Sequence, residues 1–470
     1  MRLRGALLLL ALVGAVAFLV GVSRGDAARA WGSYLVNFLF WSGLSQAGIA
    51  FLAILQVTRA RWGEPLRTSA EALAAFLPVS FALALPLPFG HGSFYRWLPE
   101  ASAREQFWLS RPFVSARLLL GLALLHGLGL LFLRRPRERL APPLLLAYAV
   151  VLSLLSFDWV MSLDPLWFST LLGGHFFIGT LYAGLAAIAL LALLRPTEPL
   201  GAQVRHDHGK LLFGFCMLWI YLVYTQYLVI WYGDLPEETG FVARRLNAAP
   251  WAALAVFVVA CGFVLPFLLL LSRRLKQSKP GLAGVAGLAL AAIFAERVLL
   301  VMPSLTDQGP FGLVELAVSA GFGAGFLLCI LPRGGREPGG VMSKQAAVLA
   351  ALVLACGAAA YAQTWEAPPA AKDLKPPAPA DEKAIERGKK LFQQNCVPCH
   401  GPTGKGDGPM GKALGIKPGN LTDAARMAHH SDGEIFWKVS KGKDPMPIFE
   451  KKLSEKERWD LVAFVRTLAK

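Results

Sequence analysis

The residues CVPCH, at positions 396–400, carry the clearest chemistry in this 470-residue chain. Two thiols separated by two residues lie on one helical turn and can reach both vinyl groups of a haem, while the adjacent histidine meets the iron from the same side. A thioredoxin-like thiol pair and half of a zinc site use the same spacing, but no second Cys or His pair follows to complete a zinc site. The motif therefore predicts one covalent haem c on Cys396 and Cys399, with His400 as an axial ligand.

The segments around this motif have the pattern of two helices that pack together. Gly388 and Phe392 lie one turn apart ahead of it, and the small glycine allows another helix to approach. Near the chain end, Ser454 is followed three residues later by Glu457, which is the pattern of a capping box. Apolar residues available for packing follow it: Trp459, Val462, Phe464 and Val465. These features predict a small monohaem cytochrome.

The second axial ligand of the iron should come from far along the chain, and Met446 is the best candidate. Prolines on both sides stiffen its loop, and a fixed thioether keeps the iron six-coordinate and raises its potential. Met410 and Met427 lack this setting and are expected to be packing or surface residues. His429 or His430 would instead give a bis-histidine site of lower potential. With both axial positions filled, the haem transfers electrons and does not bind oxygen.

The composition places most of the chain in a membrane, since 55% of the residues are hydrophobic and 17% are charged. A bilayer core about 30 Å thick is crossed by roughly 20 apolar residues in a helix. Runs of that length predict an all-α fold, a polytopic membrane bundle with ten spans: roughly 3–22, 33–57, 69–89, 113–133, 140–160, 169–194, 209–232, 250–272, 281–303 and 311–331.

The Lys and Arg residues between these spans are unevenly distributed. One set of alternate loops holds 19 of them and the other holds 8, and in membrane proteins the excess lies on the cytoplasmic side. The N-terminus, the 134–139 turn and the 332–344 segment are therefore predicted to be cytoplasmic. This placement accounts for the net charge of +16 without a nucleic-acid partner.

The chain changes character after the ten-span domain, residues 1–335. We expect a weaker eleventh span at 344–362, inside an anchoring segment 336–362, and then a Pro/Ala-rich linker at 363–384. An eleventh crossing places the cytochrome domain, 385–470, on the periplasmic side of a bacterial inner membrane. Bacteria attach haem c on that side, so two independent arguments agree.

The junction at 342–363 has the layout of a secretory signal peptide: a basic residue, an apolar run and an Ala-Tyr-Ala end. We expect it to remain as an uncleaved helix that exports the cytochrome. Cleavage after Ala362 and lipidation at Cys356 are the alternatives. The remaining cysteines, at 216, 261, 329 and 356, occur singly in apolar runs and are expected to be packing residues.

The membrane part contains three distinctive segments: 157–173 (FDWVMSLDPLWFSTLLG), 206–238 (HDHGKLLFGFCMLWIYLVYTQYLVIWYGDLPEE) and 296–303 (ERVLLVMP). They resemble the ActF membrane subunit of alternative complex III, a quinol:cytochrome c oxidoreductase, which belongs with the polysulfide-reductase-type integral membrane proteins. The tail resembles that complex's monohaem cytochrome subunit, so the chain resembles a fusion of two subunits. The resemblance implies two four-helix bundles. It also implies a set of partners: an iron–sulfur protein, a multihaem cytochrome, a second membrane anchor, quinol, and a soluble cytochrome c or terminal oxidase.

Ionisable residues inside spans need a reason, because each is costly in lipid unless it is paired or hydrated. The first candidates for a proton path are Asp158, Asp164, His175 and Glu296. The alternative is a set of buried, hydrogen-bonded residues that orient the bundles, and Asp164 could simply cap the helix after Pro165. Arg297 follows Glu296 directly, and we expect these neighbours not to pair with each other on one helix.

Other polar residues have weaker roles. We expect a group at the start of the seventh span to form the entrance of the proton path or to cap the helix: His206, Asp207, His208 and Lys210. Glu237 and Glu238 would suit a proton exit or a subunit contact, Glu315 lies in the tenth span, and His91 and His126 look structural.

Three functional hypotheses remain open. The chain is a non-autonomous subunit of a quinol:cytochrome c oxidoreductase; or its bundle itself oxidises quinol beside an iron–sulfur protein; or it is a scaffold or transporter whose cytochrome senses redox state. The sequence has no cysteine cluster for an iron–sulfur centre and no second CxxCH motif. Electrons must therefore reach this haem from other subunits.

The attachment can be tested on the purified chain. We expect a pyridine haemochrome spectrum of the c type, because Cys396 and Cys399 saturate both vinyl groups. A spectrum of non-covalent haem, or none at all, would contradict the prediction.

Overall fold

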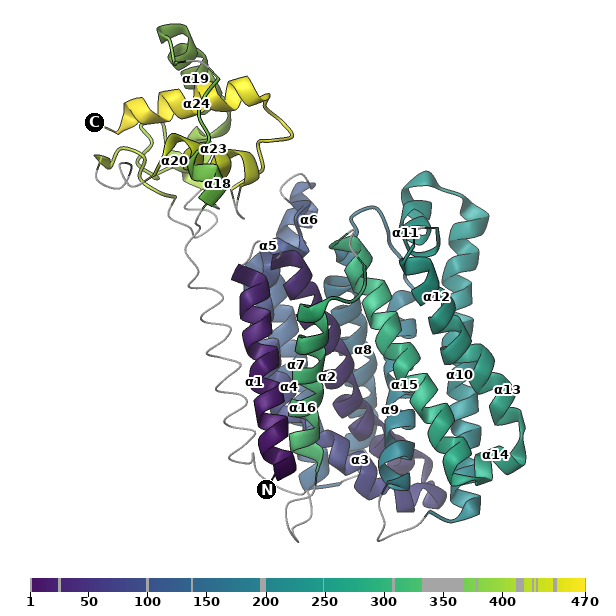
Figure 1. Cartoon of the computed structure of the whole chain (residues 1–470). Coiled ribbons are helices and arrows are strands. Elements are labelled where there is room, and N and C mark those ends of the chain that lie inside the picture. Colours follow the sequence, from purple (N-terminus) through teal and green to yellow (C-terminus); the bar gives the residue numbers. More distant parts are fainter. Residues whose placement is uncertain are drawn as a thin grey trace. The chain divides into compact units, whose positions relative to one another are not determined.

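The computed structural model divides the chain into two helical units, residues 1–362 and 363–470 (Figure 1). The residues it describes are 2–23, 27–98, 101–136, 138–194, 200–247, 249–306, 309–331, 367, 369–377, 379–410, 418–424, 427, 430–442 and 446–469. These ranges contain helices and no strand, which confirms the all-α fold class. The predicted eleventh span at 344–362 and the signal-like junction lie outside the described residues.

The first unit contains, in its described part, ten helical segments long and apolar enough to cross a membrane, as predicted. Eight of them are single helices: α1 (Arg2–Ser23), α2 (Ala27–Thr58), α7 (Arg111–Arg134), α8 (Ala141–Trp159), α9 (Leu172–Leu193), α10 (Ala202–Gly233), α15 (Lys279–Val301) and α16 (Leu313–Ile330). The third span is broken into η1 (Arg61–Leu66), α3 (Arg67–Ala74) and α4 (Leu77–Ala84). The eighth consists of α12 (Trp251–Val259), η6 (Ala260–Val264) and α13 (Leu265–Leu271).

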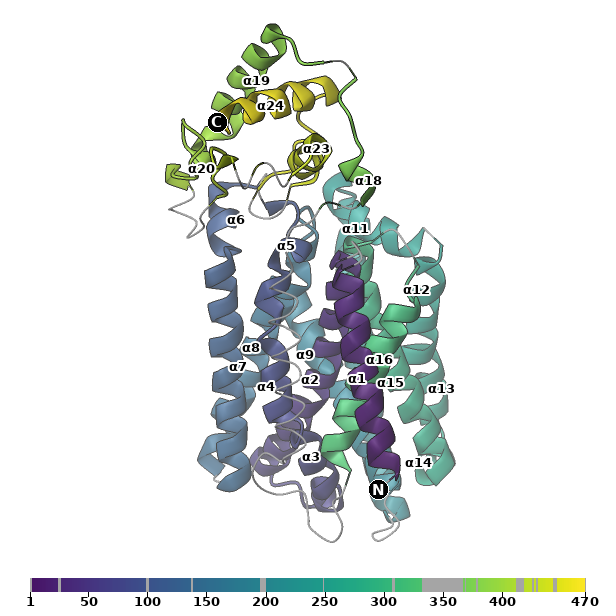
Figure 2. The same cartoon turned by 60° about the vertical axis from the view of Figure 1, so that its left-hand side comes forward.

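Eight spans form two four-helix bundles, as the resemblance implied. The first contains α2, α3 with α4, α7 and α8, and the second contains α9, α10, α12 with α13, and α15 (Figures 1 and 2). Helix α2 also packs along α9 and joins the two. Helices α1 and α16 cross beside α2, where a Cβ on Gly14 would lie 2.7 Å from the Cα of Gly321. Small residues at this crossing let the two backbones approach, as at other membrane helix interfaces.

Short helices lie at the two ends of this unit. One end carries α5 (His91–Phe94), α6 (Ala103–Trp108) and α11 (Pro236–Leu246), and the other carries the N-terminus, α3 and α14 (Arg273–Gln277) (Figure 1). The second end is rich in basic residues, among them Arg61, Arg67, Arg134, Arg273, Arg274 and Lys276. The excess of Lys and Arg counted from the sequence is therefore gathered at one end of the bundle.

The break in the eighth span follows from Pro266. Proline has no N–H, so the carbonyl of Gly262, four residues earlier, loses its helical donor. The chain forms a π-helical turn at η6, and two side chains replace the lost bond. The Tyr182 hydroxyl of α9 donates to the Gly262 oxygen at 3.1 Å, and the Cys216 thiol of α10 donates to it at 3.5 Å. The Gly262 carbonyl of the eighth span is thereby hydrogen-bonded to side chains of two other helices.

The second unit is a small helical domain. Its described helices are α18 (Pro369–Lys372), α19 (Glu382–Asn395), α20 (Val397–His400), α23 (Asp432–Lys441) and α24 (Glu455–Leu468). Helices α19 and α24 cross at Gly388, where a Cβ would overlap the carbonyl oxygen of Asp460, so the predicted role of this glycine is confirmed. The capping box of Ser454 and Glu457 is also present.

Replacing Tyr182 with Phe tests the repair at Gly262. The carbonyl would keep only the weaker thiol donor, so we expect a loss of about 1 kcal/mol of unfolding free energy, measured by thermal or denaturant unfolding in detergent. The matched control is Tyr232→Phe on α10, whose side chain is exposed. Equal effects of the two substitutions would contradict the proposed role of Tyr182.

Candidate functional site

The CVPCH motif directly follows α19: Cys396 lies between α19 and α20, and the other four residues form α20. The N–H of His400 donates to the carbonyl of Cys396 at 2.8 Å, and that of Cys399 donates to the same oxygen at 3.2 Å. This single turn holds both cysteines on one short stretch of backbone. Both thiols are free, with no disulfide between them. The arrangement therefore has the two separate nucleophilic thiols that haem attachment needs.

The chain after the motif folds back onto it. Gly401 has φ 76°, a conformation that favours glycine, and a Cβ there would overlap the Asp407 carboxylate. The N–H of Gly408 then donates to the carbonyl of Cys399 at 3.1 Å. Glycines thus allow the loop to lie directly against the backbone of the motif.

The imidazole of His400 is oriented for metal binding. Its Nδ1 lies 3.2 Å from the carbonyl oxygen of Gly419, so Nδ1 carries the proton and donates it to this bond. Burial lowers the pKa of His400, which keeps the ring neutral near pH 7. Nε2 therefore presents a lone pair, and a backbone carbonyl that fixes a ligating histidine is the usual second partner of such a ligand.

The two thiols of the motif have raised pKa values. Burial, and to a lesser extent the neighbouring Cys399, raises the pKa of Cys396 to about 12. Burial also raises the pKa of Cys399. Both thiols stay uncharged at neutral pH, and an uncharged S–H can add across a vinyl double bond. The donor set of two thiols and one neutral imidazole fits a haem c.

The methionines differ in burial. Met446 and Cys396 are both partly buried against the same apolar core, which includes Phe392 and Trp459. Met427 is 4% exposed inside that core, as expected of a packing residue, and Met410 is 51% exposed. The axial role of Met446 stays a prediction.

The two histidines proposed as alternatives to Met446 differ in what the structure shows. His430 lies 3.6 Å from the carboxylate of Glu434 and 3.4 Å from the amine of Lys438. Both neighbours belong to α23, so His430 is held against that helix. His429 lies outside the described residues.

Residues 385–469 match the family model for cytochrome c. This part of the chain is a cytochrome c domain. The domain implies one haem c and an electron-transfer role. A relative of this part is the cbb3-type cytochrome c oxidase subunit FixP of Azorhizobium caulinodans, which is 33% identical over 98 residues, or 21% of this chain and 31% of FixP.

A second similarity is to a solved structure, the reducing HAO-like protein complex of Kuenenia stuttgartiensis. It is 28% identical and covers 28% of this chain and 62% of that chain, with a TM-score of 0.20. The chain spans less than two thirds of FixP and of this second chain, and both similarities cover only a minor part of this chain.

In the membrane unit, His175 and Glu296 come together as a buried pair. His175 Nε2 lies 2.6 Å from Glu296 Oε1, and Trp219 Nε1 donates to the same oxygen at 2.8 Å. The amide of Gln226 lies 3.1 Å from His175 Nδ1. Helices α9, α10 and α15 thus meet at one carboxylate, and we call these residues and Arg297 the Glu296 network.

The expectation that Glu296 and Arg297 do not pair was wrong. Arg297 Nη1 lies 3.2 Å from Glu296 Oε2, although the residues are consecutive on α15. The guanidinium is long enough to bend back along its own helix, because α9 holds its other end. There Nη2 donates to the Phe176 carbonyl at 3.2 Å and lies 3.3 Å from Thr180 Oγ1. Both side chains are buried, so the neighbouring carboxylate compensates the charge of the guanidinium.

Asp158 and Asp164 are not part of this network, and each pairs with its own arginine. Asp158 accepts two bonds of 2.9 Å from Arg117 of α7. Asp164 accepts one of 2.6 Å from Arg244 of α11. Leu171, not Asp164, precedes α9 at its N-cap position, so the capping alternative for Asp164 was wrong. The four predicted residues therefore occupy three separate sites.

The remaining polar residues are held locally. In α10, Asp207 pairs with Lys210. The imidazole of His208 is buried and lies 2.9 Å from the Leu185 carbonyl oxygen. The helix begins at Ala202, so Asp207 and His208 do not cap it. Glu315 pairs with Arg29 of α2.

The two histidines expected to be structural are both buried and bonded. His126 binds Ser80 at 2.7 Å, and His91 binds the Leu109 carbonyl at 2.6 Å. The side chain of Glu237 lies outside the described residues, and Glu238 is half-buried.

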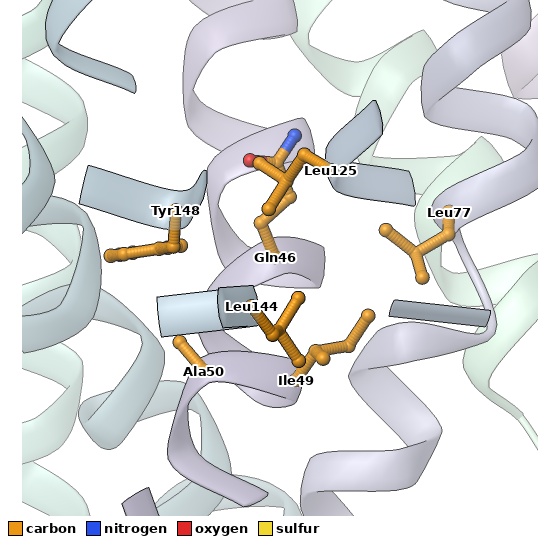
Figure 3. Close-up of a pocket in the computed structure, with 7 residues that line it drawn as sticks. All are labelled: Gln46, Ile49, Ala50, Leu77, Leu125, Leu144 and Tyr148. Carbon is orange, nitrogen blue, oxygen red and sulfur yellow. The ribbon is translucent and has the colours of Figure 1, made fainter. Parts of the chain in front are cut away.

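Two small cavities lie in the first bundle. One of about 10 Å³ is lined by Gln46, Tyr148 and five apolar residues from α2, α4, α7 and α8 (Figure 3). The Gln46 Oε1 atom is buried without a hydrogen-bond partner in the described chain. The other cavity, of about 20 Å³, lies beside Arg117 and Asp158. Each has room for water and not for a quinone ring.

Four partners of these candidate residues were not predicted from the sequence. Arg117, Arg244, Trp219 and Gln226 complete the three sites, and none was singled out. A signal existed for two of them, because Arg117 and Gln226 are lone strongly polar residues inside apolar spans, where each needs a partner. Which carboxylate takes which arginine depends on helix packing and could not be read from spacing.

Replacing Met446 with His tests the axial assignment. Imidazole stabilises the oxidised iron more than a thioether does, so the reduction potential should fall by roughly 100 mV or more, measured by redox titration of the haem absorbance. Met410→His, at an exposed position, is the matched control and should leave the potential unchanged. An unchanged potential in the Met446 variant would show that another residue holds the iron.

Proposed function

We propose that this chain is a subunit of a quinol:cytochrome c oxidoreductase of the alternative complex III type. Its membrane unit anchors the complex, and its cytochrome c domain passes electrons to a soluble cytochrome c or a terminal oxidase. One observation carries the proposal: a turn with two free thiols and an oriented imidazole lies in the same chain as a ten-span bundle. The haem supplies one-electron transfer when bound. His400 and Met446 would hold the iron of this haem, and two protein ligands would leave no open position for oxygen.

The chain needs partners to receive electrons. Among the described residues no group of three or more His, Cys, Asp or Glu side chains could hold a metal ion, and the sequence has a single CxxCH motif. The proposed donors are an iron–sulfur protein and a multihaem cytochrome, with a second membrane anchor beside the bundle. The relation to FixP, which is itself an oxidase subunit, supports a place in such an assembly.

The proposed orientation puts the N-terminus in the cytoplasm and the cytochrome c domain in the periplasm. The clustering of basic residues at the end that carries α3 and α14 supports the first half of this proposal. Haem c attachment outside the cytoplasm supports the second half.

The proposed proton path uses His175 and Glu296, which share a 2.6 Å hydrogen bond. A proton can shift between Nε2 and the carboxylate, because either group can hold it, and Arg297 stabilises the form in which Glu296 is charged. Asp158 and Asp164 lie near the end that carries α6 and α11, where they are paired with arginines. Water in the cavity beside Asp158 would connect that carboxylate to its surroundings.

The proposal is tested on the detergent-solubilised complex. We expect the chain to purify with an iron–sulfur protein and a multihaem cytochrome, and to support quinol:cytochrome c turnover. Purification as a haem-containing monomer without these partners would contradict it and favour a redox-sensing scaffold.

The role of the buried pair is tested in the same preparation. Replacing His175 with Gln removes the titratable imidazole and keeps a hydrogen-bonding side chain, so we expect quinol turnover to continue with at least a twofold lower proton release per electron, measured in vesicles. His126→Gln, another buried histidine of the bundle, is the matched control. Loss of turnover itself in the His175 variant would favour the alternative, in which the bundle oxidises quinol.

A further inference from the structure

The buried tyrosines of the membrane unit share one use. Each hydroxyl donates to a backbone carbonyl on another helical segment. The four bonds are Tyr34 to Leu83 at 2.8 Å, Tyr95 to Asp158 at 2.7 Å, Tyr148 to Phe177 at 3.0 Å, and Tyr182 to Gly262 at 3.1 Å. Each of these buried tyrosines therefore links two neighbouring segments through a hydrogen bond.

Four further tyrosines lie on α10 and have no such neighbour. Their exposed fractions are 61% for Tyr221, 57% for Tyr224, 41% for Tyr227 and 86% for Tyr232. Their hydroxyls have no hydrogen-bond partner in the part of the chain that the structure describes. We call these four residues the tyrosine face.

Part of the tyrosine face lies deep in the membrane. Between Lys210 and Asp234 the helix carries no charged residue, and this stretch is as long as a bilayer core at 1.5 Å per residue. Trp231, 64% exposed, marks one interface. Tyr221 is ten residues before it, or about 15 Å deeper, which is half of the hydrocarbon thickness. A hydroxyl at that depth meets neither water nor lipid headgroups.

Other exposed faces of the spans are built differently. Leu120 and Leu124 form the exposed side of α7, Leu146 and Val150 that of α8, and Leu268 that of α13. These aliphatic faces have no polar group, so contact with lipid alone satisfies them. Among the exposed large hydrophobic residues of the described chain, tyrosines occur on α10 alone. An unpaired hydroxyl in hydrocarbon is costly, so we expect the exposed tyrosine hydroxyls of α10 to have a hydrogen-bond acceptor on another molecule.

The exposed residues of α10 recur at the spacing of a helix-packing stripe. Gly214, Leu218, Tyr221, Leu228 and Trp231 follow one another at three-, four- or seven-residue intervals and are exposed. This spacing keeps one side of α10 along a neighbouring helix for several turns. Apart from Gly214 the stripe is bulky. Close membrane crossings use small residues, as Gly14 and Gly321 do between α1 and α16.

We propose that the tyrosine face docks a transmembrane helix of another subunit, one with small residues and with hydrogen-bond acceptors opposite Tyr221 and Tyr224. The acceptors are serine, threonine or amide oxygens, or carbonyls freed at a proline, as at Gly262. A second copy of this chain would set one bulky stripe against another and keep the backbones apart. The occupant is therefore a different helix. This inference rests on the proposed function only in taking the partner from the same complex.

Photo-crosslinking tests the location of this contact. p-Benzoyl-phenylalanine replaces Tyr221 or Tyr224 in the full chain, in the membranes where the complex assembles, and Leu120 on α7 is the matched control position. We expect adducts from both α10 positions on one transmembrane helix of the same partner subunit, identified by mass spectrometry, and lipid adducts alone from position 120. Lipid adducts alone from α10, or adducts with a second copy of this chain, would overturn the inference.

The double substitution Tyr221→Phe with Tyr224→Phe tests the hydrogen bonds. It keeps both rings and removes two hydroxyls, so we expect roughly a five- to tenfold weaker retention of the cross-linked subunit on dilution in detergent. Tyr232→Phe, at the hydrated end of the helix, should retain it as the wild type does. Unchanged retention in the double variant would overturn the role of the hydroxyls. An intact, active complex with lipid adducts at position 221 would overturn this inference alone, whereas purification without the electron-transfer partners would overturn the proposed function.

Discussion

The burial of charged and polar side chains inside the membrane unit is the constraint on which its structure depends. Glu296 is 4% exposed and its charge can be compensated only by the side chains around it. The imidazole of His175, the indole of Trp219 and the guanidinium of Arg297 all turn toward it. Because these groups come from α9, α10 and α15, one carboxylate fixes how three helices of the second bundle meet. Removing one member would leave another charged or polar group unpaired, at a cost of several kcal/mol.

The same constraint explains features that look unrelated. Pro266 removes a donor from Gly262, and a tyrosine and a cysteine on two other helices supply new ones. Asp158 and Asp164 each hold an arginine close to a span end. In these cases a group that would be unpaired instead makes a contact between helices. On the tyrosine face of α10 the exposed hydroxyls have no partner in the described chain.

The haem site depends on different interactions, because it forms in the cytochrome c domain. One helical turn holds the two thiols and the imidazole, and glycines let the following loop lie against that turn. A carbonyl at Gly419 fixes the tautomer of His400. These are local features of short sequence range. Among the described residues of the membrane unit, no group of three or more His, Cys, Asp or Glu side chains could hold a metal ion.

The sequence by itself determined the local features. It predicted the ten spans, because a span is recognised from the length and hydropathy of one continuous run of residues. It also predicted the haem c motif, the close approach at Gly388 and the capping box at Ser454, because each lies within a few residues or reflects the size of one side chain.

Only the tertiary structure decided the pairing of buried charges. From their spacing on one helix, Arg297 and Glu296 were expected not to pair, but contacts with α9 hold the guanidinium next to the carboxylate. Asp158 and Asp164 pair with arginines on other helices. Such partners are far apart in the chain and are brought together by helix packing. Whether a tyrosine of α10 has a neighbour is equally invisible in the sequence, because a buried and an exposed tyrosine read alike until the helices are assembled.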